Sequence, residues 1–184
     1  MSLLASRGQL RASFVRWALF AVPAVMLLGF ISGQMSGSGP QNPWYSELIK
    51  PDIMPPTIAF PIAWTILYAL MGLAVAFVGS AWGARGRALA LGIFVIQLLV
   101  NLAWSPLFFA QHQITAALYL IIALDVLVLI TLVLFWRIRK VAGLLLVPYL
   151  AWILFATVLN WQFLELNPGA DGAEVSGAVQ RIEL

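Results

Sequence analysis

The sequence predicts an all-α membrane protein built as a bundle of five transmembrane helices. Hydrophobic residues make up 62% of the 184 residues and charged residues 9%, whereas soluble domains are about 45–50% apolar and about 25% charged. At a mean hydropathy of +0.97, so few charges cannot cover the surface of a water-soluble globule. The composition therefore excludes a soluble enzyme, a nucleic-acid-binding module and a disordered chain.

The spacing of the charges divides the chain into membrane-crossing lengths. Three runs carry no charge and a fourth carries only Asp125: 17–46, 53–84, 141–164 and 88–136. A transmembrane helix needs about 20 apolar residues, so the longest run holds two helices, which the polar cluster at 111–113 separates. The predicted helices are about 17–35, 57–82, 88–110, 114–136 and 141–164.

Both ends of the chain are predicted to lie outside this transmembrane domain of residues 17–166. Residues 1–16 form a basic arm, and the Gly-rich, polar residues 167–184 form a flexible tail. The basic arm followed by a short apolar run also describes a cleaved signal peptide. Because Pro23 interrupts the run and no clean cleavage site follows, we favour a retained first helix.

The basic residues predict the orientation. With five crossings, eight of the ten fall on one side of the membrane and only Lys50 and Arg181 on the other. Lys and Arg accumulate on the cytoplasmic side of membrane proteins, so the N-terminus is predicted to be cytoplasmic. Tryptophans at the basic ends of three helices are typical interfacial anchors: Trp17, Trp82 and Trp136.

The first connection differs from the others, which are short and predict antiparallel neighbours. It runs from about Ser36 to Pro56 on the side opposite the N-terminus and contains five prolines. Proline limits the conformations open to a loop, and Trp44 and Tyr45 give it aromatic surface to bury. We therefore expect a structured lid, with a solvated linker as the alternative.

Three helices carry aromatic and amide side chains at helical spacing, all in the half of the bundle beneath this lid. Large aromatics with a few amides form pockets for flat, mostly apolar ligands. Core packing and hydrogen bonds between helices are the alternative explanation, above all for the asparagines. The candidate ligand-binding residues are Trp44, Phe60, Trp64, Tyr68, Asn101, Trp104, Tyr149, Trp152, Ala156 and Asn160.

Other chemistry has few candidates. Asp125 is predicted near the membrane midplane, where a carboxyl group is either functional or protonated and hydrogen-bonded within the bundle. The chain has no Cys and one His, so neither a disulfide framework nor a metal site is expected. With no nucleophile–base pair in the pattern, we expect no catalytic residues.

Three motifs stand out along the chain. The first runs from Trp44-Tyr45 through Lys50-Pro51 to Tyr68, the second from Gln97 to Phe109, and the third from Pro148 to Asn160. Together they resemble one family, the translocator proteins or tryptophan-rich sensory proteins (TspO/MBR, peripheral-type benzodiazepine receptor). The resemblance covers about residues 17–167. It implies a five-helix bundle, often dimeric, that binds porphyrins such as protoporphyrin IX and haem. The pocket it implies contains Trp64, Asn101, Trp104, Trp152, Ala156 and Asn160, with the loop around Trp44 as cover.

The resemblance also ranks the functions. We expect a tetrapyrrole-binding sensor, carrier or regulator; a photo-oxidative porphyrin-degrading enzyme and a small lipid or solute transporter are the alternatives. The animal members' cholesterol motif is not matched, because Trp161 and Glu165 stand where Tyr and a basic residue are required. A bacterial cell membrane is the expected location, and the resemblance leaves an outer-membrane or mitochondrial one open.

Assembly is predicted from small residues four apart, which let helix backbones approach closely. Ala84, Ala88 and Gly92 form such a stripe at the start of the third helix, and the resemblance implies dimer contacts there. We therefore expect a homodimer through this stripe, with packing against a neighbouring helix of the same subunit as the alternative. Two other pairs are weaker candidates: Gly29 with Gly33 and Gly72 with Ala76.

Overall fold

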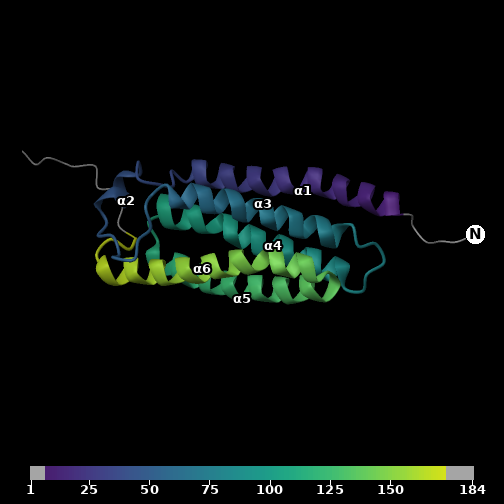
Figure 1. The fold of residues 1–184 in the computed structure, drawn as a ribbon. Coiled ribbons are helices and arrows are strands. Elements are labelled where there is room, and N and C mark those ends of the chain that lie inside the picture. Colours follow the sequence, from purple (N-terminus) through teal and green to yellow (C-terminus); the bar gives the residue numbers. More distant parts are fainter. Residues whose placement is uncertain (1–6, 173–184) are drawn as a thin grey trace, which may run out of the picture.

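The computed structural model describes residues 7–172 and contains five long helices joined in antiparallel succession (Figure 1). All five are long and apolar enough to cross a membrane. Between residues 7 and 172 there is no β-strand, so the predicted all-α five-helix fold is confirmed. The long helices are α1 (Arg7–Met35), α3 (Ala59–Gly79), α4 (Arg87–Ser105), α5 (Ile114–Ile138) and α6 (Lys140–Leu166).

The helices close into a ring whose order differs from the order in the chain. Going around the bundle, α1 packs on α3, α3 on α6, α6 on α5, α5 on α4, and α4 on α1 again. Each helix turns one apolar stripe toward the common core. The core side chains include Met71, Val78, Phe94, Leu124, Phe135, Leu146 and Ile153.

One glycine sets the separation of α1 and α3. At Gly72 of α3 a Cβ atom would lie 2.5 Å from the Cα atom of Val22 in α1. Only glycine leaves room for two backbones at this distance. The small residues at 72 and 76 are therefore used inside one subunit, with Ala76 fully buried.

The first helix begins ten residues earlier than predicted, at Arg7 rather than near residue 17. The ring of Phe14 packs on Phe77 of α3 at 4.6 Å, and the Ser13 hydroxyl accepts a hydrogen bond of 3.1 Å from the Trp82 indole. Charged residues marked the predicted boundary, but cations on an exposed helix face do not interrupt backbone hydrogen bonding. Residues 7–16 are therefore helix and not a separate arm.

The connection between α3 and α4 corrects the predicted small-residue stripe. Gly83 and Gly86 have positive φ angles of 77° and 78°, and helix α4 begins only at Arg87, so Ala84 lies in the turn. The Arg87 guanidinium donates two hydrogen bonds, of 3.0 and 2.6 Å, to the Gly79 carbonyl at the end of α3. Ala88 and Gly92 remain on the helix and are exposed.

The predicted 88–110 helix is continuous but changes its winding. Helix α4 ends at Ser105, and Pro106–Ala110 form one π-helical turn, η1. Proline has no N–H to donate to the preceding turn, and π-turns commonly take up such interruptions. The Gln111 N–H closes the turn by donating to the Pro106 carbonyl at 3.0 Å.

The loop between α1 and α3 is folded, as predicted, and defines what we call the outer end of the bundle. It contains a short helix, α2 (Pro43–Glu47). The Asn42 side chain accepts from the Tyr45 N–H at 2.9 Å and donates to the Phe109 carbonyl at 3.0 Å. Trp44 and Tyr45 are 6% and 8% exposed. The opposite end, with the α3–α4 turn, is the inner end.

The segment after α6, which we predicted to be a flexible tail, makes specific contacts with the lid and α5 over residues 167–172. The Asn167 amide bonds both backbone groups of Ile49, at 2.7 and 3.0 Å. The Asp171 carboxylate accepts from the N–H and hydroxyl of Thr115 at the start of α5, at 3.1 and 2.6 Å. The high glycine content of this segment suggested flexibility, but the Asn167 and Asp171 side chains hydrogen-bond to backbone groups of the lid and of the first turn of α5. Residues 173–184 of the predicted tail lie outside the described residues.

Candidate functional site

Six of the ten candidate residues meet between α3, α4 and α6. The Trp64 ring stacks on Tyr68 at 5.1 Å and meets Tyr149 edge-on at 6.4 Å. Phe60 meets the edge of Trp152 at 5.8 Å. Helical spacing explains this, because residues 60, 64 and 68 lie on one face of α3, the face that packs on α6. These rings and Asn101 are called the aromatic cluster below.

The amide oxygens beside these rings already accept hydrogen bonds, whereas Gln97 Nε2 is buried without a partner among the described residues. The Tyr68 hydroxyl donates to Asn101 Oδ1 at 3.0 Å, and the Tyr149 hydroxyl donates to Gln97 Oε1 at 3.0 Å. Tyr149 is fully buried and Gln97 is 1% exposed. Asn101 thus joins α3 to α4, and Gln97 joins α4 to α6. This is the inter-helix role that the sequence left open beside ligand contact.

Three other candidates close the outer end instead of lining the aromatic cluster. The Trp104 indole donates to Asn160 Oδ1 at 3.1 Å, and Asn160 Nδ2 donates to the Ile114 carbonyl at 3.0 Å. Trp104 also stacks on Phe108 at 5.0 Å. Trp44 stacks on His112 at 4.5 Å and donates to the Ala170 carbonyl at 3.3 Å. Trp44, Trp104 and Asn160 therefore hold lid and helices together.

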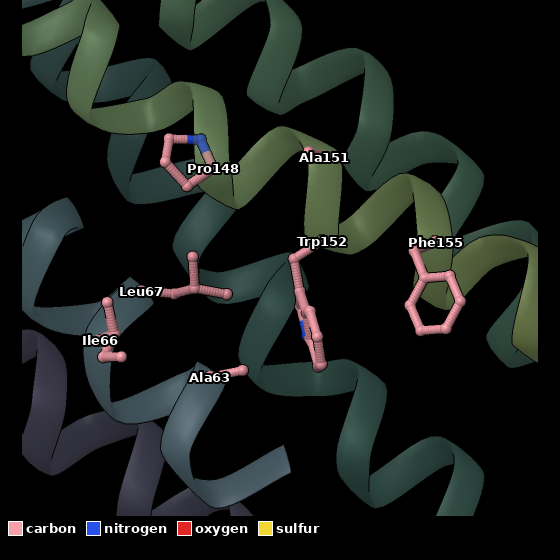
Figure 2. A pocket seen from close by; sticks show the side chains of 7 residues that line it. All are labelled: Ala63, Ile66, Leu67, Pro148, Ala151, Trp152 and Phe155. Atoms are coloured by element: carbon pink, nitrogen blue, oxygen red, sulfur yellow. The ribbon is translucent and has the colours of Figure 1, made fainter. Parts of the chain in front are cut away.

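A groove of about 500 Å³ opens between α3 and α6 beside the aromatic cluster. Figure 2 shows Trp152 of α6 extending toward α3, where Ala63 lies on the facing helix, with Phe155 further along α6. The volume lies within the range of about 300–1,000 Å³ that small-molecule sites have. The lining residues are Ala63, Ile66, Leu67, Pro148, Ala151, Trp152 and Phe155.

Of these lining residues the sequence had singled out only Trp152. Ala63 and Ala151 leave the space by being small, and Pro148 lies inside α6, where it removes a backbone donor. The sequence signal for this groove was a proline four residues before a tryptophan on one helix, with an alanine facing them from another helix. To use that signal, one would have to know that α3 and α6 are neighbours. Ala156 packs against the core, one helical turn beyond Trp152.

The Asp125 carboxyl group, which belongs to α5, contacts α6 on a side away from the groove. Its Oδ2 atom is 2.8 Å from the Thr157 hydroxyl, which is also 2.9 Å from the Ile153 carbonyl. Thr157 is five residues from Trp152, or about 140° around the helix at 3.6 residues per turn. The carboxyl group therefore joins α5 to α6 and does not reach the groove. Its Oδ1 atom is buried without a partner.

Between residues 7 and 172, no three His, Cys, Asp or Glu side chains gather. What the geometry offers is an apolar groove with half-buried aromatic side chains, polar groups behind it whose oxygens accept hydrogen bonds, and a folded lid. Such a site can bind a flat apolar molecule by stacking and by burial of its surface.

Comparison with known proteins supports the resemblance seen in the motifs. The TspO/MBR family model matches residues 21–166. The chain belongs to the TspO/MBR family. It is 40% identical over 144 residues to the tryptophan-rich protein TspO of Chlorobaculum tepidum, covering 78% of this chain and 90% of that protein. It is 39% identical over 127 residues to the protein CrtK of Rhodobacter capsulatus, covering 68% and 79%.

Animal relatives match over a similar length. The human translocator protein is 33% identical over 147 residues, which cover 79% of this chain and 87% of that protein. The match to the TspO/MBR model begins within α1, at residue 21, and covers the lid and the other four long helices. The protein is accordingly a multi-pass integral membrane protein of this family, and its groove and aromatic cluster lie within the matched region.

Proposed function

We propose that the protein binds a tetrapyrrole of the protoporphyrin IX or haem class within the membrane and acts as a sensor, carrier or regulator of porphyrin levels. The observation that carries the proposal is the groove between α3 and α6, where Trp152 and Phe155 present aromatic faces to an apolar space of about 500 Å³. A porphyrin is flat, aromatic and largely apolar, so stacking and burial both favour it there.

The test is a titration of the purified protein with protoporphyrin IX, followed by quenching of tryptophan fluorescence. Trp152→Ala removes the indole that lines the groove, so we expect the affinity to fall by about 1–3 kcal/mol, the range of an aromatic anchor in a binding site. Trp64→Ala acts through the aromatic cluster behind the groove and should reduce affinity less. Trp136→Ala is the matched control, because Trp136 lies on α5 near the inner end.

Equal losses at all three tryptophans would mean general destabilisation and would remove the groove as the site. The titration is run in the dark and under illumination. An unchanged pigment spectrum under light supports binding alone, whereas loss of the pigment spectrum would favour the porphyrin-degrading alternative.

The expected location and assembly form part of the proposal. Eight cations at the inner end predict a cytoplasmic inner end in a bacterial cell membrane, with membrane lipids around the bundle. Ala88 and Gly92 are exposed on α4, and a Cβ atom at Gly92 would meet no atom within 4 Å. The surface there is free to pack against a second copy in a homodimer.

A further inference from the structure

A second hollow, of about 270 Å³, lies at the outer end between the lid and the start of α3. Unlike the groove, it is lined by a cation and by three residues with hydroxyl groups. We infer that this hollow binds a carboxylate group of the ligand and that Lys50 supplies the positive charge. The lining residues are Pro40, Tyr45, Ser46, Lys50, Met54 and Thr57.

The Lys50 ammonium has only neutral partners in the described structure. It donates to the backbone carbonyls of Tyr45 and Leu48, and its Nζ atom lies 3.9 Å from the centroid of the Tyr45 ring. An ammonium has three N–H donors, so one donor remains beyond these two carbonyls. Two nearby carboxylates in the lid, Glu47 and Asp52, are exposed to water.

Burial makes an anionic partner favourable at this position. Desolvation lowers the pKa of Lys50 below its ordinary value, which means that the charged form has lost part of its hydration. A carboxylate bound in the hollow would compensate for that loss with a charge-assisted hydrogen bond. The Ser46 hydroxyl already donates to the Pro43 carbonyl at 2.7 Å, so the Thr57 hydroxyl is the one that can donate to the same carboxylate.

The hollow and the groove adjoin at the start of α3. Thr57 lines the hollow, and its carbonyl accepts from the Phe60 N–H at 3.4 Å. The Phe60 ring in turn meets Trp152, which lines the groove, at 5.8 Å. Because Thr57 is exposed and Phe60 is half-buried, a flat molecule stacked at Trp152 can extend past Phe60 toward Lys50.

The inference rests on the proposed function, and it predicts which tetrapyrroles the protein prefers. Protoporphyrin IX and haem carry a pair of propionate carboxylates on one edge of an otherwise apolar ring. The ring would lie in the groove and the propionate edge would point to the outer end. Free-acid porphyrins should then be preferred over esters of the same ring.

A purely structural role for Lys50 makes a different prediction. The carbonyls that it contacts belong to the end of α2, where a basic side chain commonly caps a helix. In that role, loss of Lys50 would loosen the lid and weaken all ligands alike. The two roles differ in whether the effect depends on the ligand's charge.

The experiment compares protoporphyrin IX with its dimethyl ester, which keeps the ring and removes both carboxylates. Each is titrated against the wild type, Lys50→Gln, Lys50→Arg and the control Lys140→Gln, which removes the chain's other lysine at the inner end. We expect the wild type to bind the free acid roughly three- to tenfold more tightly than the ester. The ratio should fall to about one in Lys50→Gln and stay near the wild-type value in Lys50→Arg and Lys140→Gln.

Each outcome is decisive. A wild type that binds acid and ester equally overturns the Lys50 assignment and leaves the proposed function intact, whereas a wild type that binds neither overturns the proposed function itself. If Lys50→Gln weakens both ligands by the same factor, the lysine is a lid clamp and the inference is wrong. Thermal unfolding of each variant, compared with the wild type, shows whether a lost ratio comes from an intact fold.

Discussion

Replacing Gly72 with alanine tests the central packing contact of the bundle, between α1 and α3. A Cβ atom at this position would lie 2.5 Å from Val22 Cα and 2.9 Å from Val22 N. Ordinary contact starts at 3.4 Å, so the two backbones must separate by about 0.9 Å (3.4 minus 2.5). No rotamer change relieves this clash, because the atoms that it meets belong to the main chain.

The cost follows from that separation. A gap of 0.5–1 Å forfeits about a quarter to a half of each dispersion contact, and overpacking in cores costs about 1–3 kcal/mol. Alanine gains about 0.5–1 kcal/mol over glycine inside a helix, which offsets part of this cost. We expect Gly72→Ala to lower the free energy of unfolding by about 1–2 kcal/mol.

Two other glycines provide matched comparisons. Gly33 of α1 has no atom within 4 Å of an added Cβ, so Gly33→Ala should be neutral or slightly stabilising. At Gly79 the added atom would meet the Trp17 ring at 2.5 Å, and a side chain can move, so Gly79→Ala should fall between them. The assay is reversible unfolding of detergent-solubilised protein in sodium dodecyl sulfate, followed by circular dichroism. If Gly72→Ala is as stable as Gly33→Ala, the helices are further apart than described here.

Three further predictions concern assembly, the buried carboxyl group and pH. Gly92→Leu should weaken the proposed dimer while porphyrin binding largely survives, and mass measurement in mild detergent decides this; a monomeric wild type or a variant that dimerises normally removes the interface. Asp125→Asn should change the free energy of unfolding by no more than about 0.5 kcal/mol, whereas Asp125→Ala should lower it by about 1 kcal/mol. The reason is that the single Thr157 hydroxyl proton cannot serve both the Asp125 carboxyl group and the Ile153 carbonyl, so a protonated carboxyl group supplies the second proton. A large loss in Asp125→Asn, measured by the same unfolding assay, would contradict a neutral acid. Burial raises the pKa of Tyr45 to about 12, so its contribution to stability is complete below pH 10 and is lost between about pH 10 and 12; Tyr45→Phe should remove this part of the pH dependence, and an unchanged profile would exclude Tyr45 as its source.

Most of the fold could be predicted because the bilayer imposes a length. Charge-free runs separated by Lys, Arg or a polar cluster located all five helices, and the observed outer boundaries differ by only a few residues. The exceptions are informative. The extension of α1 to Arg7 and the helical break before Arg87 depend on tertiary contacts, namely the packing of Phe14 and the hydrogen bonds from Arg87 to Gly79, which charge spacing does not encode.

The candidate site could be predicted only in part, because helical periodicity identifies faces and not neighbours. The spacing of Phe60, Trp64 and Tyr68 placed them on one stripe, and the structure brings them against α6. The sequence does not state that α3 and α6 are adjacent, so it could not combine Ala63 with Pro148 and Ala151 into one groove. Nor could it separate Trp104, which belongs to the closure of the outer end.

The pairing of the interior amides bears on how a ligand reaches the bundle. Asn101 and Asn160 already accept hydrogen bonds from Tyr68 and Trp104, and breaking a buried pair leaves an unsatisfied group that costs about 1–3 kcal/mol. A ligand that entered the centre of the bundle from above the lid would incur this cost several times. The groove requires no such exchange, since its walls are apolar and open between α3 and α6. A membrane-soluble ligand that approaches from the bilayer therefore meets the half-buried rings of Trp152 and Phe155 before any polar group.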